Sequence, residues 1–232
     1  MNRTLNVVRM QLVNRATYIW VPLMVLGGTI VITLAIFGLI ASTGNVEAAM
    51  FGGGAQAPLW YFAVVGVQAL TLTFPFSQAM SVTRREFYLG TLITAALTAL
   101  GLALLFVIGG FIEEATNGWG LGGYMFRLTW VWSQGAVVAG LFFFSLAMLF
   151  FVVGFCGATV YKRWGNVVLT ISLIGLALLF VAGLWLIGQL QAWPEVMSWF
   201  GSLTPISLTG AMLAVAAVLA GGSYLMLRRS IA

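Results

Sequence analysis

Residues 18–41 read YIWVPLMVLGGTIVITLAIFGLIA, an uninterrupted apolar run without a charged side chain. A helix of about 20 apolar residues crosses a bilayer, and the apolar core of a cleaved signal peptide is shorter, at about 7–15 residues. Five further runs have the same character, at roughly 58–80, 91–112, 131–160, 166–189 and 205–227. The sequence therefore predicts an all-α polytopic membrane protein with six transmembrane helices.

Two of these runs are irregular. The run at 131–160 is longer than one crossing needs, so we expect it to tilt or to begin as an interfacial segment near Trp130 and Trp132. Pro75 lies inside the second run, close to its end, and predicts a kink there.

The composition of the whole chain agrees with a membrane protein. Of its 232 residues, 62% are hydrophobic and 6% are charged, whereas soluble domains average about 45–50% apolar and about 25% charged residues. This excludes a soluble globular domain, a disordered chain and a fibrous repeat. Six spans leave only short loops, so we expect a single transmembrane domain over residues 1–232.

A basic segment, residues 1–17, precedes the first span. Its apolar side chains recur at helical spacing with three arginines elsewhere: Met1, Leu5, Val8, Leu12 and Ala16, against Arg3, Arg9 and Arg15. This pattern predicts an amphipathic interfacial helix that lies on an anionic membrane surface and contacts its lipids. The alternative is a frayed basic terminus that only helps to set the topology.

The cations predict the orientation of the chain. When successive loops are assigned to alternate sides, one side collects nine of the ten Lys and Arg residues, and the other holds only Arg127. Four of the five glutamates fall on the side of Arg127: Glu47, Glu113, Glu114 and Glu195. The positive-inside rule then places both termini in the cytoplasm. The net charge of +5 thus serves orientation, and we expect no nucleic-acid partner.

Missing residue types exclude several kinds of chemistry. The chain has no histidine and no aspartate, and Cys156 is its only cysteine. A haem held by histidine, a His-based zinc site, a Ser-His hydrolase and an intrachain disulfide therefore cannot be built from this chain alone. Lys162, the only lysine, does not follow a glycine-rich turn as a phosphate loop requires. We expect no catalytic residue, no metal site and no cofactor in this chain.

Polar residues inside the spans are few. Charged residues at mid-membrane depth usually mark ion or proton pathways, and none lies well inside a predicted span. Gln68 lies near the middle of the second span, with Thr71 three residues further on. Its amide has two interpretations, an interhelical hydrogen bond and a group facing a pathway. Gln68 and Thr71 are the candidates for lining a pathway.

The most informative loop lies between the second and third spans and reads SVTRREFYLGT over residues 81–91. Thr83 and Glu86 have the spacing of a capping box, which predicts a short helix beginning at Thr83. That helix would carry two arginines and then two aromatic rings: Arg84, Arg85, Phe87 and Tyr88. The plainer interpretation is a turn with positive-inside charge and two interfacial aromatics.

This loop resembles the corresponding loop in the permease subunits of bacterial ABC exporters, the class that exports drugs, antibiotics and polysaccharides. That family often carries Ser or Thr, two arginines, a spacer, phenylalanine and glycine at this place. The basic N-terminal helix, the six spans with both ends inside, and a proline-containing extracellular stretch before the last span, here residues 191–205, also agree. The resemblance covers the whole chain in architecture and this one loop in motif.

The resemblance implies a location, partners and site residues. The chain would be an exporter permease of the bacterial cytoplasmic membrane, pairing with a second permease, identical or related, and driven by separate ATPase subunits that bind the ATP. Residues 81–90 would form the coupling helix that docks into an ATPase, through Ser81, Thr83, Arg84, Arg85, Glu86, Phe87 and Tyr88. Because aromatic side chains are common interface anchors, Phe87 and Tyr88 would be the anchors and the arginines the polar rim.

Two other classes of function remain as alternatives: a membrane-embedded immunity or assembly protein, and a lipid-modifying membrane enzyme. The missing histidine and aspartate and the lack of buried acid–base pairs argue against an enzyme. An ATPase that stays bound during purification would favour the permease over both.

Overall fold

The structure is a computed structural model that describes residues 3–43 and 49–229. Met1 and Glu47, which enter the predictions above, lie outside these residues. The described chain is almost entirely helical, which confirms the all-α class. Its principal helices are α1 (Arg3–Val13), α2 (Val21–Ser42), α3 (Ala57–Gln68), α4 (Phe74–Ala79), α5 (Arg84–Ala115), α6 (Ala136–Gln189), α7 (Trp193–Ser202) and α8 (Pro205–Arg229).

Short elements join or extend these helices. Two are π-helical, η1 (Ala16–Trp20) and η3 (Ala69–Thr73), and one is a 3-10 turn, η2 (Gly54–Gln56). A fourth, η4 (Gly118–Gly122), is a tight loop in which Gly118, Trp119, Gly120 and Gly122 have positive φ. Two short strands, β1 (Met50–Phe51) and β2 (Gly123–Tyr124), pair in parallel and tie two loops together. The irregularity expected at Pro75 takes the form of η3. Pro75 has no N–H to donate. Just before it, the backbone hydrogen bonds take π-helical spacing, with the Phe74 N–H donating to the Ala69 carbonyl.

Within residues 3–43 and 49–229, five helical segments are long and apolar enough to cross a bilayer. They are Ala16–Ser42, Ala57–Ala79, Arg84–Ala115, Ala136–Gln189 and Pro205–Arg228. The chain is thus a helical protein of membrane-spanning character.

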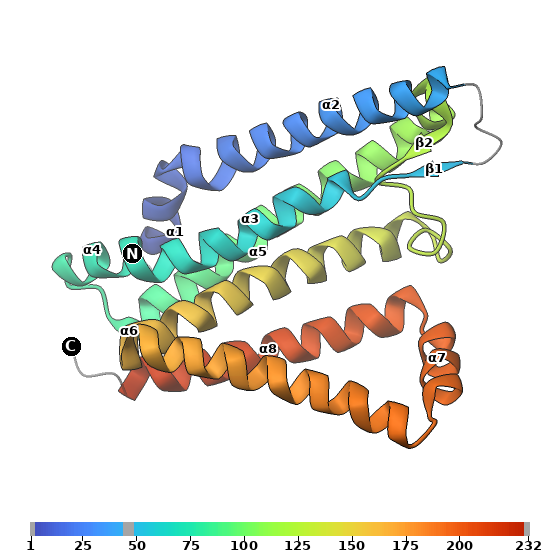
Figure 1. The fold of residues 1–232 in the computed structure, drawn as a ribbon. Coiled ribbons are helices and arrows are strands. Elements are labelled where there is room, and N and C mark those ends of the chain that lie inside the picture. Colours follow the sequence, from blue (N-terminus) through green and yellow to red (C-terminus); the bar gives the residue numbers. More distant parts are fainter. Residues whose placement is uncertain (1–2, 44–48, 230–232) are drawn as a thin grey trace.

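The longest of these segments, α6, covers two predicted spans. Its 54 residues would extend about 80 Å as one straight helix. It is interrupted at Gly165, whose φ of +82° is not helical, and Figure 1 shows the ribbon turning back at this point. We call residues 136–164 the first arm of α6 and residues 166–189 the second arm.

The helix of the fourth predicted span, expected to start at about residue 131, begins at Ala136. Residues 131–134 form turns, and the helix begins only after Gly135, whose φ is +92°. Trp130 lies in this turn and donates from Nε1 to the Leu203 carbonyl at 3.3 Å. The first residues of this apolar run therefore lie outside the helix, and their position at a membrane interface stays a prediction.

The first arm of α6 forms the centre of the bundle, where it packs against α3, α5 and α8. Small residues bring α3 and α6 into backbone contact, because a Cβ atom at Gly66 would collide with the Phe151 carbonyl and one at Gly154 with the Ala63 carbonyl. Aromatic rings fill the core beside them, for example Phe106 against Phe143 with ring centroids 4.9 Å apart.

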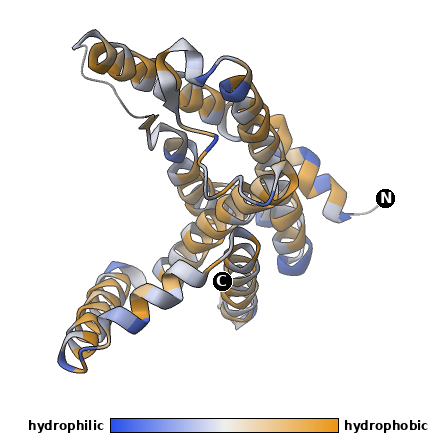
Figure 2. Ribbon diagram, turned by 90° about the vertical axis from the view of Figure 1, so that its right-hand side faces the viewer, coloured by the Kyte–Doolittle hydropathy of each residue, from blue (hydrophilic) through white to orange (hydrophobic). Residues whose placement is uncertain are grey.

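The second arm of α6 and α7 stand apart from the rest of the bundle (Figures 1 and 2). Nearly every side chain of the second arm is exposed, including Leu179, Phe180 and Trp185. In a membrane protein such a surface faces lipid or another chain.

The loops and helix ends gather at two opposite ends of the bundle (Figure 1). One end, called the basic end below, holds α1, the turn between α4 and α5, the turn at Gly165 and the last turn of α8. The opposite end holds the loops before α3 and after α5, together with α7.

Candidate functional site

The turn that resembles the exporter loop lies at the basic end. Thr83 caps α5: its Oγ1 accepts the Glu86 N–H at 3.3 Å, and Glu86 Oε2 accepts the Thr83 N–H at 3.1 Å. The predicted capping box is therefore confirmed. The helix that it starts is not a separate short helix, because α5 continues without a break to Ala115. Residues 84–90 form the first two turns of α5, ahead of the third predicted span at 91–112.

The aromatic residues of this turn face the protein interior. Phe87 is 0% exposed and packs against Phe74, with ring centroids 5.0 Å apart. The Tyr88 hydroxyl donates to the Ala220 carbonyl at 2.6 Å, and the ring lies 5.7 Å from that of Phe155. The structure thus contradicts the prediction that these rings are surface anchors for a partner. Both rings lie on the buried face of α5, where Phe87 contacts α4 and Tyr88 contacts α6 and α8.

The remaining predicted site residues form the surface of the turn. Ser81, Thr83 and Arg85 are exposed, whereas Arg84 and Glu86 are partly buried. The turn is held from both sides, since Gln78 Nε2 donates to the Val82 carbonyl at 3.0 Å and the Val82 N–H to the Ser77 carbonyl at 3.1 Å. Arg84 donates to the Leu227 carbonyl at 3.0 Å, which ties the turn to the last turn of α8.

Helix α1 packs against α5 and projects sideways from the bundle (Figure 2). Gln11 Nε2 donates to Thr91 Oγ1 at 2.7 Å. Gly90 lets the two helices touch, because a Cβ atom there would lie 2.6 Å from the Val7 Cβ. The predicted helix at residues 1–17 is confirmed over Arg3–Val13. Its packed face carries Val7 and Gln11, whereas Leu5 of the expected apolar stripe is exposed.

No protein-family model, no curated protein and no solved structure matches this chain. The resemblance to exporter permeases therefore has no support beyond the loop motif and the predicted arrangement of the helices.

The two candidates for lining a pathway separate. Gln68 lines a cavity of about 350 Å³ between α1 and η3. Within the described part of the chain its amide makes no hydrogen bond, so the interhelical bond considered for it is not formed here. Thr71 bonds to its own helix, donating to the Val67 carbonyl at 2.9 Å, and does not line this cavity.

The opposite end contains a site that the sequence did not reveal. Glu113, at the end of α5, is 0% exposed. Its carboxylate accepts four hydrogen bonds, from Trp119 Nε1 at 3.0 Å and from three backbone N–H groups, those of Met125 at 2.9 Å, Phe126 at 3.0 Å and Arg127 at 2.7 Å. The loop after α5 is thus wrapped around one buried carboxylate.

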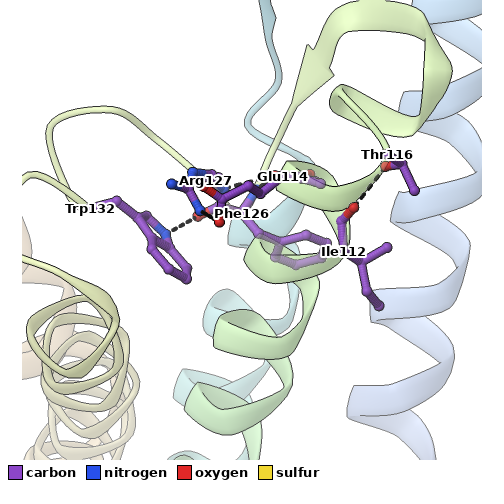
Figure 3. A network of polar contacts seen from close by, with 7 residues as sticks. Ile112, Glu114, Thr116, Phe126, Arg127 and Trp132 are labelled. Carbon is purple, nitrogen blue, oxygen red and sulfur yellow. Dashed lines mark hydrogen bonds and ion pairs between the residues drawn. The ribbon is translucent and has the colours of Figure 1, made fainter.

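Further contacts join the neighbouring residues Glu114, Phe126, Arg127 and Trp132 (Figure 3). Arg127 forms an ion pair with Glu114 and lies over the Trp132 ring, 4.9 Å from its centroid. Trp132 Nε1 donates to the Phe126 carbonyl at 3.0 Å. These contacts close the loop over the end of α5, so Arg127, the one cation predicted on this side, has a structural partner.

No metal cluster is evident within residues 3–43 and 49–229, where no three Cys or Glu side chains gather as metal ligands would.

Proposed function

We propose that this chain is the transmembrane permease subunit of an ATP-driven ABC exporter in a bacterial cytoplasmic membrane. It binds no ATP itself. Two permeases, identical or related, enclose the pathway, and separate ATPase subunits supply the energy. The observation that carries the proposal is the construction of the basic end, where the SVTRREFYLGT turn, α1 and the end of α8 are bonded into one surface.

The proposal includes six spans. They are α2, the pair α3 and α4, α5, the first and second arms of α6, and α8. Two crossings in α6 are supported by its length and by the reversal at Gly165 (Figure 1). Both termini and the basic end are cytoplasmic, an orientation supported by the charges. Among the cations of the described residues, Arg127 alone belongs to the opposite end.

The coupling surface differs from the one that the motif alone suggests. Its contact residues are the exposed ones of the turn, Ser81, Thr83 and Arg85, with Arg84 and Glu86 holding the turn in shape. Phe87 and Tyr88 lie beneath this surface and join it to the helices behind. In this proposal, a displacement of the turn by a bound ATPase is transmitted to α4 through the contact of Phe87 with Phe74, and to α8 through the hydrogen bond of Tyr88 to Ala220.

Isolation of the tagged chain from the membranes of its own host tests the proposal. We expect a co-purified protein that carries a G-x-x-x-x-G-K-[ST] phosphate loop and hydrolyses ATP, whereas the chain separated from it hydrolyses none. Arg85→Glu should release this ATPase. Arg163→Glu, which reverses an exposed cation in another turn of the basic end, should retain it. Turnover by the isolated chain, or equal retention by both variants, would refute the proposal.

A further inference from the structure

The cavity of about 350 Å³ at the basic end is unusual in its lining. It lies between α1, η1 and η3, and its wall combines the apolar Met10, Leu72 and Phe76 with six polar, uncharged residues: Gln11, Asn14, Thr17, Tyr18, Gln68 and Thr73. Its volume is at the small end of the range for ligand sites, about 300–1,000 Å³. A packed membrane helix bundle gains nothing from an open polar cavity unless its groups find partners.

Two amides of this wall lack such partners. Gln11 is 1% exposed, and its Nε2 is bonded to Thr91, but its Oε1 is buried without a donor. Gln68 makes no hydrogen bond with another residue of the described chain. Buried polar groups are nearly always satisfied in native proteins, so an unsatisfied one calls for a specific explanation.

The backbone around the cavity is irregular on two sides. Thr17 and Tyr18 belong to the π-helical η1. The π-helical η3 begins directly after Gln68 and ends at Thr73. The Tyr61 hydroxyl donates to the Thr17 carbonyl at 3.2 Å, and Tyr18 and Thr73 both line the cavity. Single π-helical turns occur often at functional sites, and here two of them border one cavity.

We propose that this cavity binds an uncharged ligand with hydroxyl groups. The Gln11 carbonyl oxygen requires a donor, the Gln68 amide offers both a donor and an acceptor, and no ionisable carboxylate or cation lines the wall. A hydroxyl group meets all three conditions, whereas a phosphate or carboxylate leaves the oxygen unpaired. The site depends neither on transport nor on an ATPase.

Two sources can supply this chemistry, a free polyol and the headgroup of a lipid-like molecule. Leu72 and Phe76 line the cavity and are exposed, so an acyl chain attached to a bound headgroup would lie on apolar side chains. The probe is monooleoylglycerol with a diazirine beside its ester, in vesicles of phosphatidylcholine, whose own headgroup carries no hydrogen-bond donor.

We expect saturable photolabelling of α1 or η3 in the parent protein, competed by unlabelled monooleoylglycerol and not by oleate. If free glycerol competes as well, the ligand is a polyol. If only the lipid competes, it is a headgroup. Both results support the site.

The variants form a matched set on one helix. Gln68→Leu should weaken the apparent affinity about tenfold, as expected when hydrogen bonds to a bound group are lost, and Thr73→Val should also weaken it. Thr71→Val, the same substitution in the same π-helical segment but away from the cavity, should leave it unchanged. Thermal unfolding of each variant checks the fold. No saturable labelling in the parent, or equal affinity in all three variants, would overturn the proposal and leave the cavity to water.

Discussion

Glu113 and Glu114 are neighbours in the chain, yet their surroundings differ completely. Glu113 is buried and its carboxylate accepts three backbone N–H groups and an indole N–H. Glu114 makes an ion pair with Arg127 and its side chain is 53% exposed. Hydrogen bonds to a buried charge are strong, and leaving their donors unpaired is costly. An exposed ion pair contributes little.

We therefore predict that Glu113→Gln lowers the free energy of unfolding by about 3 kcal/mol, because the new amide N–H₂ faces groups that are themselves donors. Glu114→Gln should cost about 0–1 kcal/mol. Thermal unfolding in detergent, followed by tryptophan fluorescence, measures both. Similar losses in the two variants would contradict the assignment of Glu113 as the residue that organises this loop.

At the scale of the element, the course of α5 determines which side chains of residues 81–90 are buried and which are exposed. The sequence predicted the capping box and most helix limits, because those signals are local. It did not predict that α5 runs on from the cap, which turns Phe87 and Tyr88 inward. The hydrogen bonds to Glu113 could not be predicted for a similar reason. Their backbone donors, Met125, Phe126 and Arg127, are brought to the end of α5 by a loop. The path of this loop depends on glycines with positive φ.

The burial of Phe87 changes what its truncation should do. Phe87→Ala removes a fully buried ring and should cost about 3–5 kcal/mol in stability. Leu89→Ala, two residues further on and exposed, should cost about 1 kcal/mol or less. Unfolding midpoints of both variants, without any partner present, test this. A fully stable Phe87→Ala protein would return Phe87 to the role of an interface anchor.

Gly90 and Gly101 test how α1 is held on α5. A Cβ atom at Gly90 would meet Val7 and the Thr4 carbonyl, whereas nothing lies within 4 Å of one at Gly101. Gly90→Ala should loosen α1 and speed tryptic cleavage after Arg9, while Gly101→Ala should leave cleavage unchanged. Equal cleavage rates in the two variants would show that α1 is held elsewhere.

At the scale of the whole molecule, the described cations gather at the basic end, with Arg127 alone at the opposite end, and the proposed orientation in the membrane rests on this separation. The basic end carries the capped turn, α1 and the uncharged polar cavity, and the opposite end carries the loop around Glu113. An ATPase in the cytoplasm can reach the turn only if the basic end is cytoplasmic. The central claim is therefore that the chain crosses the membrane six times with this end inside.

Cysteine accessibility tests that claim most directly. In a Cys156→Ser background, single cysteines replace exposed residues at the basic end, Thr83 and Asn166, and at the opposite end, Asn117 and Ser198. An impermeant thiol reagent added to intact cells should label the cysteines at 117 and 198 and leave those at 83 and 166 unlabelled until the membrane is opened. Labelling at 83 or 166 from outside the cell would contradict the six-span orientation and the coupling surface built on it.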